Sequence, residues 1–190
     1  MPMNKTAVIV VDLIEEFTKE EGAIYYPETE AIIPSVKRLL DGARESGCLI
    51  VFMQHRYRAH KYDRNLEKMR PSCIEGTKGV RIDSRLEVDE KKDFVIPKRR
   101  YSAFFGTDLD LVLREHGVKH LIIVGTKTNN CINATALDAH NLAYDAHVVR
   151  ECVSTNDPTV QNIYLNDIQK YICDVDSLNS ILDKLKSGDL

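Results

Sequence analysis

The sequence predicts an α/β fold of three layers (α/β/α), with a six-stranded, mostly parallel sheet between two layers of helices. Short apolar runs rich in β-branched residues alternate along the chain with longer segments whose apolar residues recur at helical spacing. The first run, residues 6–11, is apolar from its second residue to its last, which is typical of a strand buried on both faces. A chain of 190 residues is long enough for one such core, so we expect one domain that spans residues 1–190.

Three of the six strands are expected in the first half of the chain. The predicted elements are, in order, a strand at 6–11, a helix at 29–46, a strand at 48–53 and a strand at 93–96. Gly47 ends the helix. Residues 54–92 are charged and poor in apolar side chains, and we interpret them as a long loop. A loop of this length in a compact domain is usually functional or lies at an interface.

The second half of the chain alternates regularly between helix and strand. The predicted elements are a helix at 107–116, a strand at 119–124, a helix from 131 to about 143, a strand at 145–150, a helix at 157–170, a strand at 171–175 and a helix at 177–186. Thr107 and Ser177 can cap the first and last of these helices, and Gly117 ends the first. This alternation favours parallel strands joined by helical crossovers.

Charge and hydropathy argue against several kinds of partner. The net charge of −3 offers no basic surface for nucleic acid and no polybasic patch for a membrane. No apolar run is long enough to cross a bilayer, and residues 1–6 lack the apolar core of a signal peptide. We therefore expect a cytoplasmic protein without nucleic-acid or membrane partners.

The five cysteines are widely spaced and include no Cys-x-x-Cys pair, which argues against a zinc ribbon or a thioredoxin motif. Three of them fall in strand-like runs and are expected in the core: Cys48, Cys152 and Cys173. Cys73 falls in the long loop, and we expect it to be inert.

Cys131 differs from the other cysteines because it follows a strand and a glycine and lies in the first turn of a helix. Gly125 allows a sharp exit from the strand, and a helix begins within a few residues of it. The partial positive charge of a helix N-terminus favours thiolate over thiol. Cys131 is therefore a candidate nucleophile, and the alternative is a buried structural cysteine.

Two further candidates follow other strands of the predicted sheet. Asp12 comes directly after the first strand, and Lys98 comes shortly after the third. Because ligands of such sheets gather at the carboxyl ends of the strands, Asp12, Lys98 and Cys131 could share one site. Asp12 could accept the thiol proton, and Lys98 could stabilise both anions. The alternatives are a helix cap or turn residue at Asp12 and a solvated surface lysine at Lys98.

The sequence around these three residues resembles the isochorismatase-like cysteine hydrolases. Two blocks carry the resemblance, Lys-x-x-x-Ser-Ala-Phe-x-Gly-Thr from Lys98 and Gly-x-x-Thr-x-x-Cys ending at Cys131, together with the Val-Ile-Val-Val-Asp segment that ends at Asp12. The superfamily includes N-carbamoylsarcosine amidase, nicotinamidase and ureidoacrylate amidohydrolase. The resemblance extends from about Lys5 to Val175.

The resemblance implies a Rossmann-like isochorismatase-type fold and an Asp–Lys–Cys triad at Asp12, Lys98 and Cys131. It also implies a cis peptide bond between Thr126 and Lys127, with the backbone N–H groups of Lys127 and Cys131 as the oxyanion hole. The implied reaction is cleavage of a small-molecule amide or carbamoyl bond through a Cys131 thioester, with release of ammonia and without a cofactor.

One departure from the superfamily narrows the substrate. Nicotinamidases carry a metal-binding Asp-x-His after the second strand, where this chain reads Gln54-His55-Arg56-Tyr57. The resemblance therefore favours the N-carbamoylsarcosine amidase branch, and we expect no metal. We interpret His55, His60 and Asp63 as solvated loop residues rather than ligands. Nicotinamidase activity, hydrolysis of a ureidoacrylate or vinyl-ether substrate, and a non-enzymatic redox sensor remain as alternatives.

Substrate contacts and assembly are predicted more coarsely. Arg56 and Arg100 could bind a substrate carboxylate in a bidentate manner, as could their neighbours Arg58 and Arg99. Tyr101 is a candidate for the pocket wall. The resemblance implies a homo-oligomer, either dimer or tetramer, to which the stretch 54–92 could contribute contacts.

Overall fold

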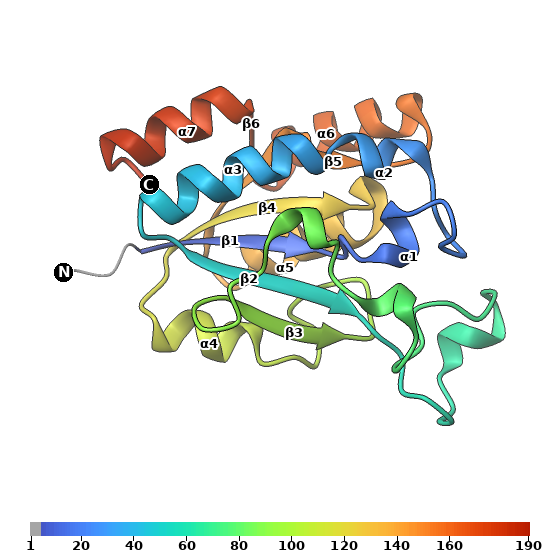
Figure 1. Ribbon diagram of the computed structural model, residues 1–190. Helices are drawn as coiled ribbons and strands as arrows, with labels where there is room; N and C mark the ends of the chain where they lie inside the picture. Colours follow the sequence, from blue (N-terminus) through green and yellow to red (C-terminus); the bar gives the residue numbers. More distant parts are fainter. Residues whose placement is uncertain (1–4) are drawn as a thin grey trace.

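The computed structural model describes residues 5–190 and contains a six-stranded sheet between two layers of helices (Figure 1). The strands are β1 (Thr6–Val11), β2 (Leu49–His55), β3 (Phe94–Lys98), β4 (His120–Thr126), β5 (Asp145–Ser154) and β6 (Asp174–Asp176). Their order in the sheet is β3-β2-β1-β4-β5-β6, and every neighbouring pair is parallel. The predicted fold class is confirmed, with a fully parallel sheet.

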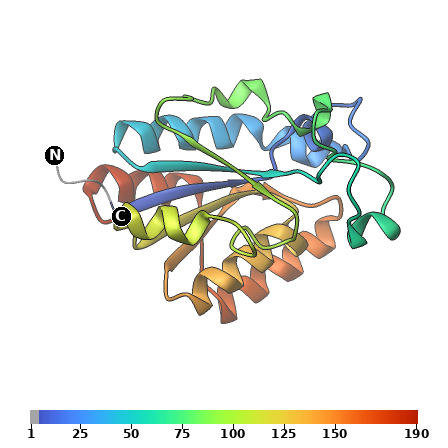
Figure 2. The ribbon, with the colours of Figure 1, turned by 90° about the horizontal axis from the view of Figure 1, so that it is seen from below.

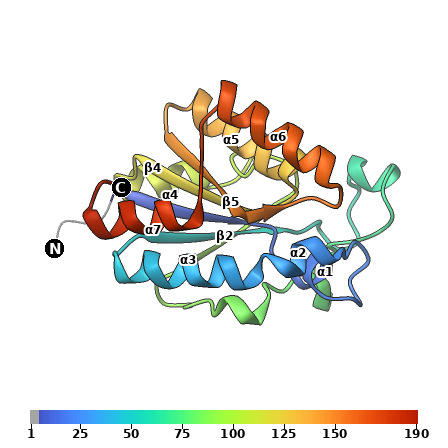
Figure 3. The same ribbon diagram turned by 90° about the horizontal axis from the view of Figure 1, so that it is seen from above.

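Both faces of the sheet are covered by helices. On one face α3 (Ile33–Glu45) and α7 (Leu178–Ser187) pack against Val8 and Val10 of β1. On the other, α4 (Leu109–Glu115), α5 (Asn133–Asn141) and α6 (Pro158–Tyr171) cover Ala7 and Ile9. Figures 2 and 3 show these two helical layers on opposite sides of the sheet. The continuous apolar run of β1 is explained by this double burial.

Two strands extend further than predicted, and both extensions bear on the site. β2 continues to His55, so this histidine ends a strand rather than beginning a loop. β3 continues through Pro97 to Lys98, which is the last residue of the strand. Pro97 is tolerated there because β3 is an edge strand, where a residue without an N–H loses no ladder hydrogen bond on its open side.

Other boundaries also differ from the predicted ones. Cys131 lies in a π-helical turn (Thr128–Ile132) that precedes α5, and not in the first turn of an α-helix. β5 continues to Ser154 after an irregularity in its pairing with β4. The predicted sixth strand begins later because α6 runs to Tyr171.

The stretch between β2 and β3 is not an open loop. It holds three short 3₁₀ helices, at Arg64–Glu67, Lys78–Val80 and Ser84–Leu86. Isolated bridges pair Tyr57 with Ile74 and Ile82 with Ile14, and Tyr57, Ile14 and Cys73 share a small hydrophobic cluster of their own. This stretch, residues 56–93, is called the excursion below. It is packed beside the segment that follows β1, which holds α1 (Glu15–Thr18) and α2 (Pro27–Ala31).

No helix within residues 5–190 is both long enough and apolar enough to cross a membrane.

Gly125 allows β4 to approach β1 closely just before the Cys131 turn. Its φ is +120°, and a Cβ at this position would lie 2.0 Å from the carbonyl oxygen of Val11. Because that oxygen belongs to the backbone of a central strand, it cannot move aside cheaply. Gly117 also has a positive φ, of +64°, but a Cβ there would meet nothing within 4 Å.

We therefore expect Gly125→Ala to destabilise the protein by about 3 kcal/mol, because backbone atoms of two central strands must separate. Gly117→Ala is the matched control and should cost about 1 kcal/mol, from the left-handed conformation alone. Urea unfolding followed by circular dichroism measures both. Equal losses in the two variants would show that the approach of β4 to β1 does not require glycine.

Candidate active site

Asp12 is the first residue after β1 and is fully buried. Its backbone has a left-handed conformation, with φ of 57°, and its N–H donates to the carbonyl of Met53 at 2.9 Å. Aspartate and asparagine tolerate this region better than other non-glycine residues. The conformation turns the chain at the carboxyl end of the central strand. It leaves the Asp12 carboxylate near His55 and Lys98, the last residues of β2 and β3.

Lys98 brings the three predicted residues together. Its ammonium Nζ lies 2.6 Å from Oδ2 of Asp12 and 3.3 Å from Sγ of Cys131. The same nitrogen donates to the carbonyl oxygen of Arg100 at 3.0 Å. With 1% of its surface exposed, Lys98 is a buried cation rather than a solvated surface lysine.

The charges of Asp12 and Lys98 support one another. Burial opposes ionisation of the Asp12 carboxyl, but the Lys98 ammonium beside it holds the pKa of that carboxyl below its usual value. Burial likewise opposes the charged form of Lys98, and the Asp12 and Cys131 groups more than offset this and raise the Lys98 pKa. The pair is therefore charged across the neutral pH range. One member without the other would be an uncompensated buried charge.

The Cys131 thiol is protonated in the resting structure. Burial raises its pKa to about 12, because the opposing effect of Lys98 is smaller and the Asp12 carboxylate adds to the rise. The expectation that the turn would favour thiolate is therefore wrong for the resting protein. Asp12 lies beside this sulfur: a carboxylate oxygen of Asp12, a ring nitrogen of His55 and Sγ of Cys131 all fall within 4.8 Å of one another.

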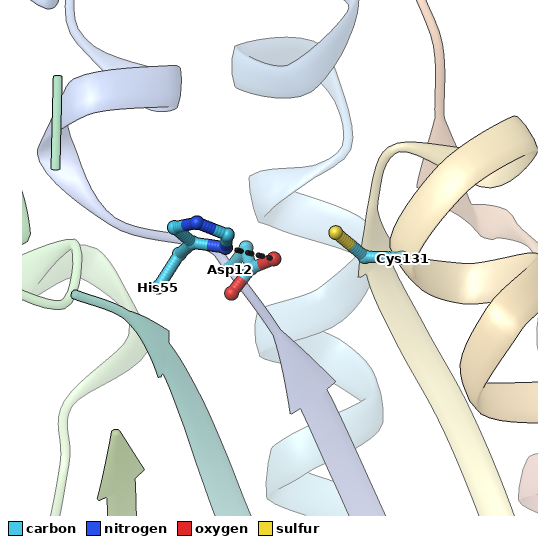
Figure 4. A group of neighbouring side chains, drawn as sticks. All are labelled: Asp12, His55 and Cys131. Carbon is cyan, nitrogen blue, oxygen red and sulfur yellow. Dashed lines mark ion pairs between the residues drawn. The ribbon is translucent and has the colours of Figure 1, made fainter. Parts of the chain in front are cut away.

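His55 is a member of this cluster that the sequence interpretation missed. It is buried, and its Nδ1 lies 3.2 Å from the Lys98 ammonium and 3.8 Å from Oδ2 of Asp12. Figure 4 shows it at the end of the strand next to Asp12, with the Cys131 sulfur directed toward the same point. The sequence did contain a signal for His55. Side chains alternate between the two faces along β2, so His55 lies on the same face as Val51 and Met53, which share a core cluster with Cys131.

The other two residues interpreted as solvated differ from each other. His60 is exposed, as expected. Asp63 is buried, and its carboxylate pairs with Arg99 at 3.4 Å and Arg100 at 3.1 Å. The interpretation as solvated loop residues is thus wrong for His55, because β2 continues to this residue, and for Asp63, because the excursion is packed.

Asp12, His55 and Cys131 offer oxygen, nitrogen and sulfur donors that a transition metal could accept. The Lys98 ammonium already lies at the point where these groups converge, 2.6–3.3 Å from an atom of each. A metal ion at that point would meet a fixed positive charge. The donor set therefore does not fit a metal while Lys98 is charged.

The turn before Cys131 is built around Thr126 and Lys127. The peptide bond between them is cis. The Thr126 hydroxyl is buried and hydrogen-bonds with the Tyr26 hydroxyl, while the Lys127 carbonyl accepts from the N–H groups of Asn130 and Ile132 at 3.0 and 3.1 Å. These bonds fix the backbone of the turn beside the Cys131 sulfur.

A pocket of about 320 Å³ opens onto the Cys131 sulfur. Its walls are rich in aromatic rings, from Phe17, Tyr25, Tyr26, Tyr57 and Tyr101. Its charged lining residues are Arg70 and Lys127, and His55 also contributes. This volume is at the lower end of the range for small-molecule sites, about 300–1,000 Å³.

The structure places the three predicted substrate contacts in two different places. Tyr101 lines the pocket at Cys131. Arg56 and Arg100 instead border a separate hollow of about 530 Å³ beside the ends of β2 and β3. Arg56 faces Glu75 there at 3.8 Å, and Arg100 is paired with Asp63. Neither arginine lines the pocket that holds the sulfur.

Comparison with known proteins identifies related sequences and folds. Residues 6–180 match the isochorismatase domain. A protein of Arabidopsis thaliana named as a probable inactive nicotinamidase is 31% identical over 177 residues, covering 87% of this chain and 89% of that protein. A ureidoacrylate amidohydrolase of Agrobacterium fabrum is 26% identical over 201 residues, covering 93% and 88%. The crystal structure of a cysteine hydrolase from Pseudomonas syringae has a TM-score of 0.89 and 26% identity, covering 99% and 96%.

The first prediction from this geometry concerns stability. Lys98→Met should destabilise the protein by about 3–5 kcal/mol, because it leaves the Asp12 carboxylate buried without a cation. Asp12→Asn combined with Lys98→Met should recover part of the loss. Lys37→Met, which breaks an exposed pair with Asp41, is the control and should cost at most about 1 kcal/mol.

The difference in the free energy of unfolding between wild type and Lys98→Met should also depend on pH. A lowered Asp12 pKa stabilises the fold above the unfolded value of about 3.9, and a raised Lys98 pKa does so below about 10.4. In Lys98→Met, burial acts on the Asp12 carboxyl without the offsetting cation and raises its folded-state pKa above the unfolded value. The difference between wild type and Lys98→Met should therefore be largest at neutral pH and above, and should shrink progressively as the pH falls toward about 4. Urea unfolding at several pH values measures it, and a difference that matches the Lys37→Met control throughout would contradict the buried pair.

The second prediction concerns the thiol. With a pKa of about 12, the thiolate fraction of Cys131 should rise about tenfold for each pH unit between pH 7 and 10. Alkylation of the Cys131 peptide by iodoacetamide, quantified by mass spectrometry, should follow the same slope. Glutathione in the same tube is the control and should approach a plateau above about pH 9. A plateau for Cys131 near pH 8 would show a thiolate in the resting protein.

Proposed function

The chain belongs to the isochorismatase domain family of hydrolases, and from this premise we propose that it is a cysteine amidohydrolase. In this proposal Cys131 is the nucleophile, Asp12 the general base and acid, and Lys98 the cation that stabilises both. The substrate is a small molecule with an amide or carbamoyl group, and ammonia is released. The observation that carries the proposal is the position of one buried ammonium between the Asp12 carboxylate and the Cys131 sulfur.

The proposed reaction begins with proton transfer from the Cys131 thiol to Asp12 as the sulfur attacks the carbonyl carbon. Negative charge develops on the carbonyl oxygen, which the backbone N–H groups of Lys127 and Cys131 would stabilise. Asp12 then returns the proton to the leaving nitrogen, and the C–N bond breaks. Water attacks the resulting thioester, gives a proton to Asp12, and the sulfur leaves and is reprotonated.

Charge balance makes the first step feasible in a buried site. Before the transfer, Lys98 is paired with the Asp12 carboxylate at 2.6 Å; afterwards it would be paired with the Cys131 thiolate, now at 3.3 Å. The number of buried charges does not change, because the negative charge moves from one neighbour of the ammonium to the other. A thiolate without this cation would carry the full cost of burial.

Four observations favour a carbamoyl substrate of the N-carbamoylsarcosine type. The segment after β2 lacks the Asp-x-His motif, and the Lys98 ammonium is located where a metal would meet Asp12, His55 and Cys131. The small pocket suits a short, flexible substrate. The relative from Agrobacterium fabrum is named for a substrate of the same chemical kind, a ureido acid.

A second candidate is a ring amide such as nicotinamide. It is favoured by the aromatic walls of the pocket, because flat rings stack on the rings of tyrosine and phenylalanine. Ammonia release from N-carbamoylsarcosine and from nicotinamide, measured in parallel, discriminates between the two candidates. Release of pyruvate from a vinyl-ether substrate would indicate a different bond specificity on the same fold.

Cys131→Ala should reduce ammonia release at least about 10³-fold, because the thioester cannot form. Its melting temperature should remain close to that of the wild type, since the side chain is small. Cys173→Ala, at the far end of the sheet, is the matched control and should keep full activity. Turnover by Cys131→Ala at the level of this control would contradict a cysteine mechanism.

A further inference from the structure

The pocket at Cys131 has an unbalanced charge. None of the residues that line it is an aspartate or a glutamate, whereas Arg70 and Lys127 both contribute positive side chains. Asp12 lies beneath the pocket, and its charge is balanced by Lys98 at 2.6 Å. The space above the sulfur therefore faces two cations and no counter-ion from its own walls.

Arg70 lies in the excursion and is solvent-exposed at the pocket. Several other arginines of the excursion and of the segment after β3 are held by carboxylates, Arg56 by Glu75, and Arg99 and Arg100 by Asp63. The excursion arginines without a carboxylate partner among the described residues, Arg58, Arg64 and Arg81, do not line this pocket. Arg70 makes no hydrogen bond or ion pair with any residue in the range 5–190. Its guanidinium thus remains available for a bidentate contact with a ligand.

Lys127 approaches from the turn that carries the nucleophile. Its Nζ donates to the neutral amide oxygen of Asn156 and lies 5.3 Å from the centre of the Tyr26 ring. No carboxylate within the described residues pairs with it, and burial lowers its pKa. A bound anion would offset that cost.

We infer that the substrate carries a carboxylate in addition to the scissile amide, and that Arg70 and Lys127 bind it. This rests on the proposed function and names the substrate class. Arg70 supplies the planar pair of N–H donors that matches a carboxylate, and Lys127 supplies a second charge four residues from the nucleophile. Neutral amides lack the group that these side chains bind. Arg70, rather than Arg56 or Arg100, is then the arginine that determines specificity.

The test separates binding from chemistry. The Cys131→Ser protein, which holds the pocket without the nucleophile, is titrated by calorimetry with N-carbamoylsarcosine, N-carbamoylglycine and N-carbamoyl-β-alanine, and with the methyl ester of each. At least one acid should bind at least about tenfold more tightly than its ester. Adding Arg70→Gln should remove that preference and leave ester binding unchanged, and Arg70→Lys should restore part of it.

Arg58→Gln is the matched control, because Arg58 is an exposed arginine of the same excursion that does not line this pocket. In the protein with Cys131 intact, Arg70→Gln should raise KM for the acid about 10- to 100-fold, with a smaller effect on kcat. Equal binding of acids and esters, no binding of any acid, or equal effects of Arg70→Gln and Arg58→Gln would overturn the inference. Arg70-dependent binding of an acid without ammonia release would support the inference and count against the proposed reaction.

Discussion

The buried ammonium of Lys98 is the interaction on which the site depends. The sheet order places β3 two strands away from β1, a separation of about 10 Å. His55 lies on the strand between them and is the register partner of Lys98. Only a long side chain at the end of β3 can pass His55 and reach Asp12, and lysine has both the length and the charge. The arrangement thus requires both this strand order and this residue type.

Backbone geometry positions the partners of that ammonium. Asp12 leaves β1 in a left-handed conformation, and β4 approaches β1 at Gly125, where no side chain would fit. The two features bring the residue after β1 and the turn after β4 to the same edge of the sheet. The cost of burying Lys98 falls when the Asp12 carboxylate and the Cys131 sulfur are both close to its ammonium. The close backbone approach and the stabilisation of the buried charge therefore depend on each other.

Much of this site could be predicted from the sequence, because it follows from parallel topology. Asp12, Lys98 and Cys131 each follow an apolar run, and carboxyl ends of parallel strands meet at one edge. His55 was missed because the apolar run of β2 ends at Met53, while the strand itself continues for two more residues. The direction of the Cys131 pKa was missed because desolvation depends on what covers the sulfur, and the covering segments are distant in sequence.

The excursion explains why the side chains proposed to contact the substrate were harder to predict than Asp12, Lys98 and Cys131. Its arginines differ little in local sequence, and their roles are decided by which carboxylates the tertiary structure brings near them. Asp63 is buried and pairs with Arg99 and Arg100, whereas Arg70 lines the pocket and has no carboxylate partner within the described residues. In the proposed reaction this division has a physical consequence. The triad keeps a constant charge during proton transfer, so the positive potential at the pocket is available to a carboxylate at one end of the substrate and to the developing oxyanion at the other.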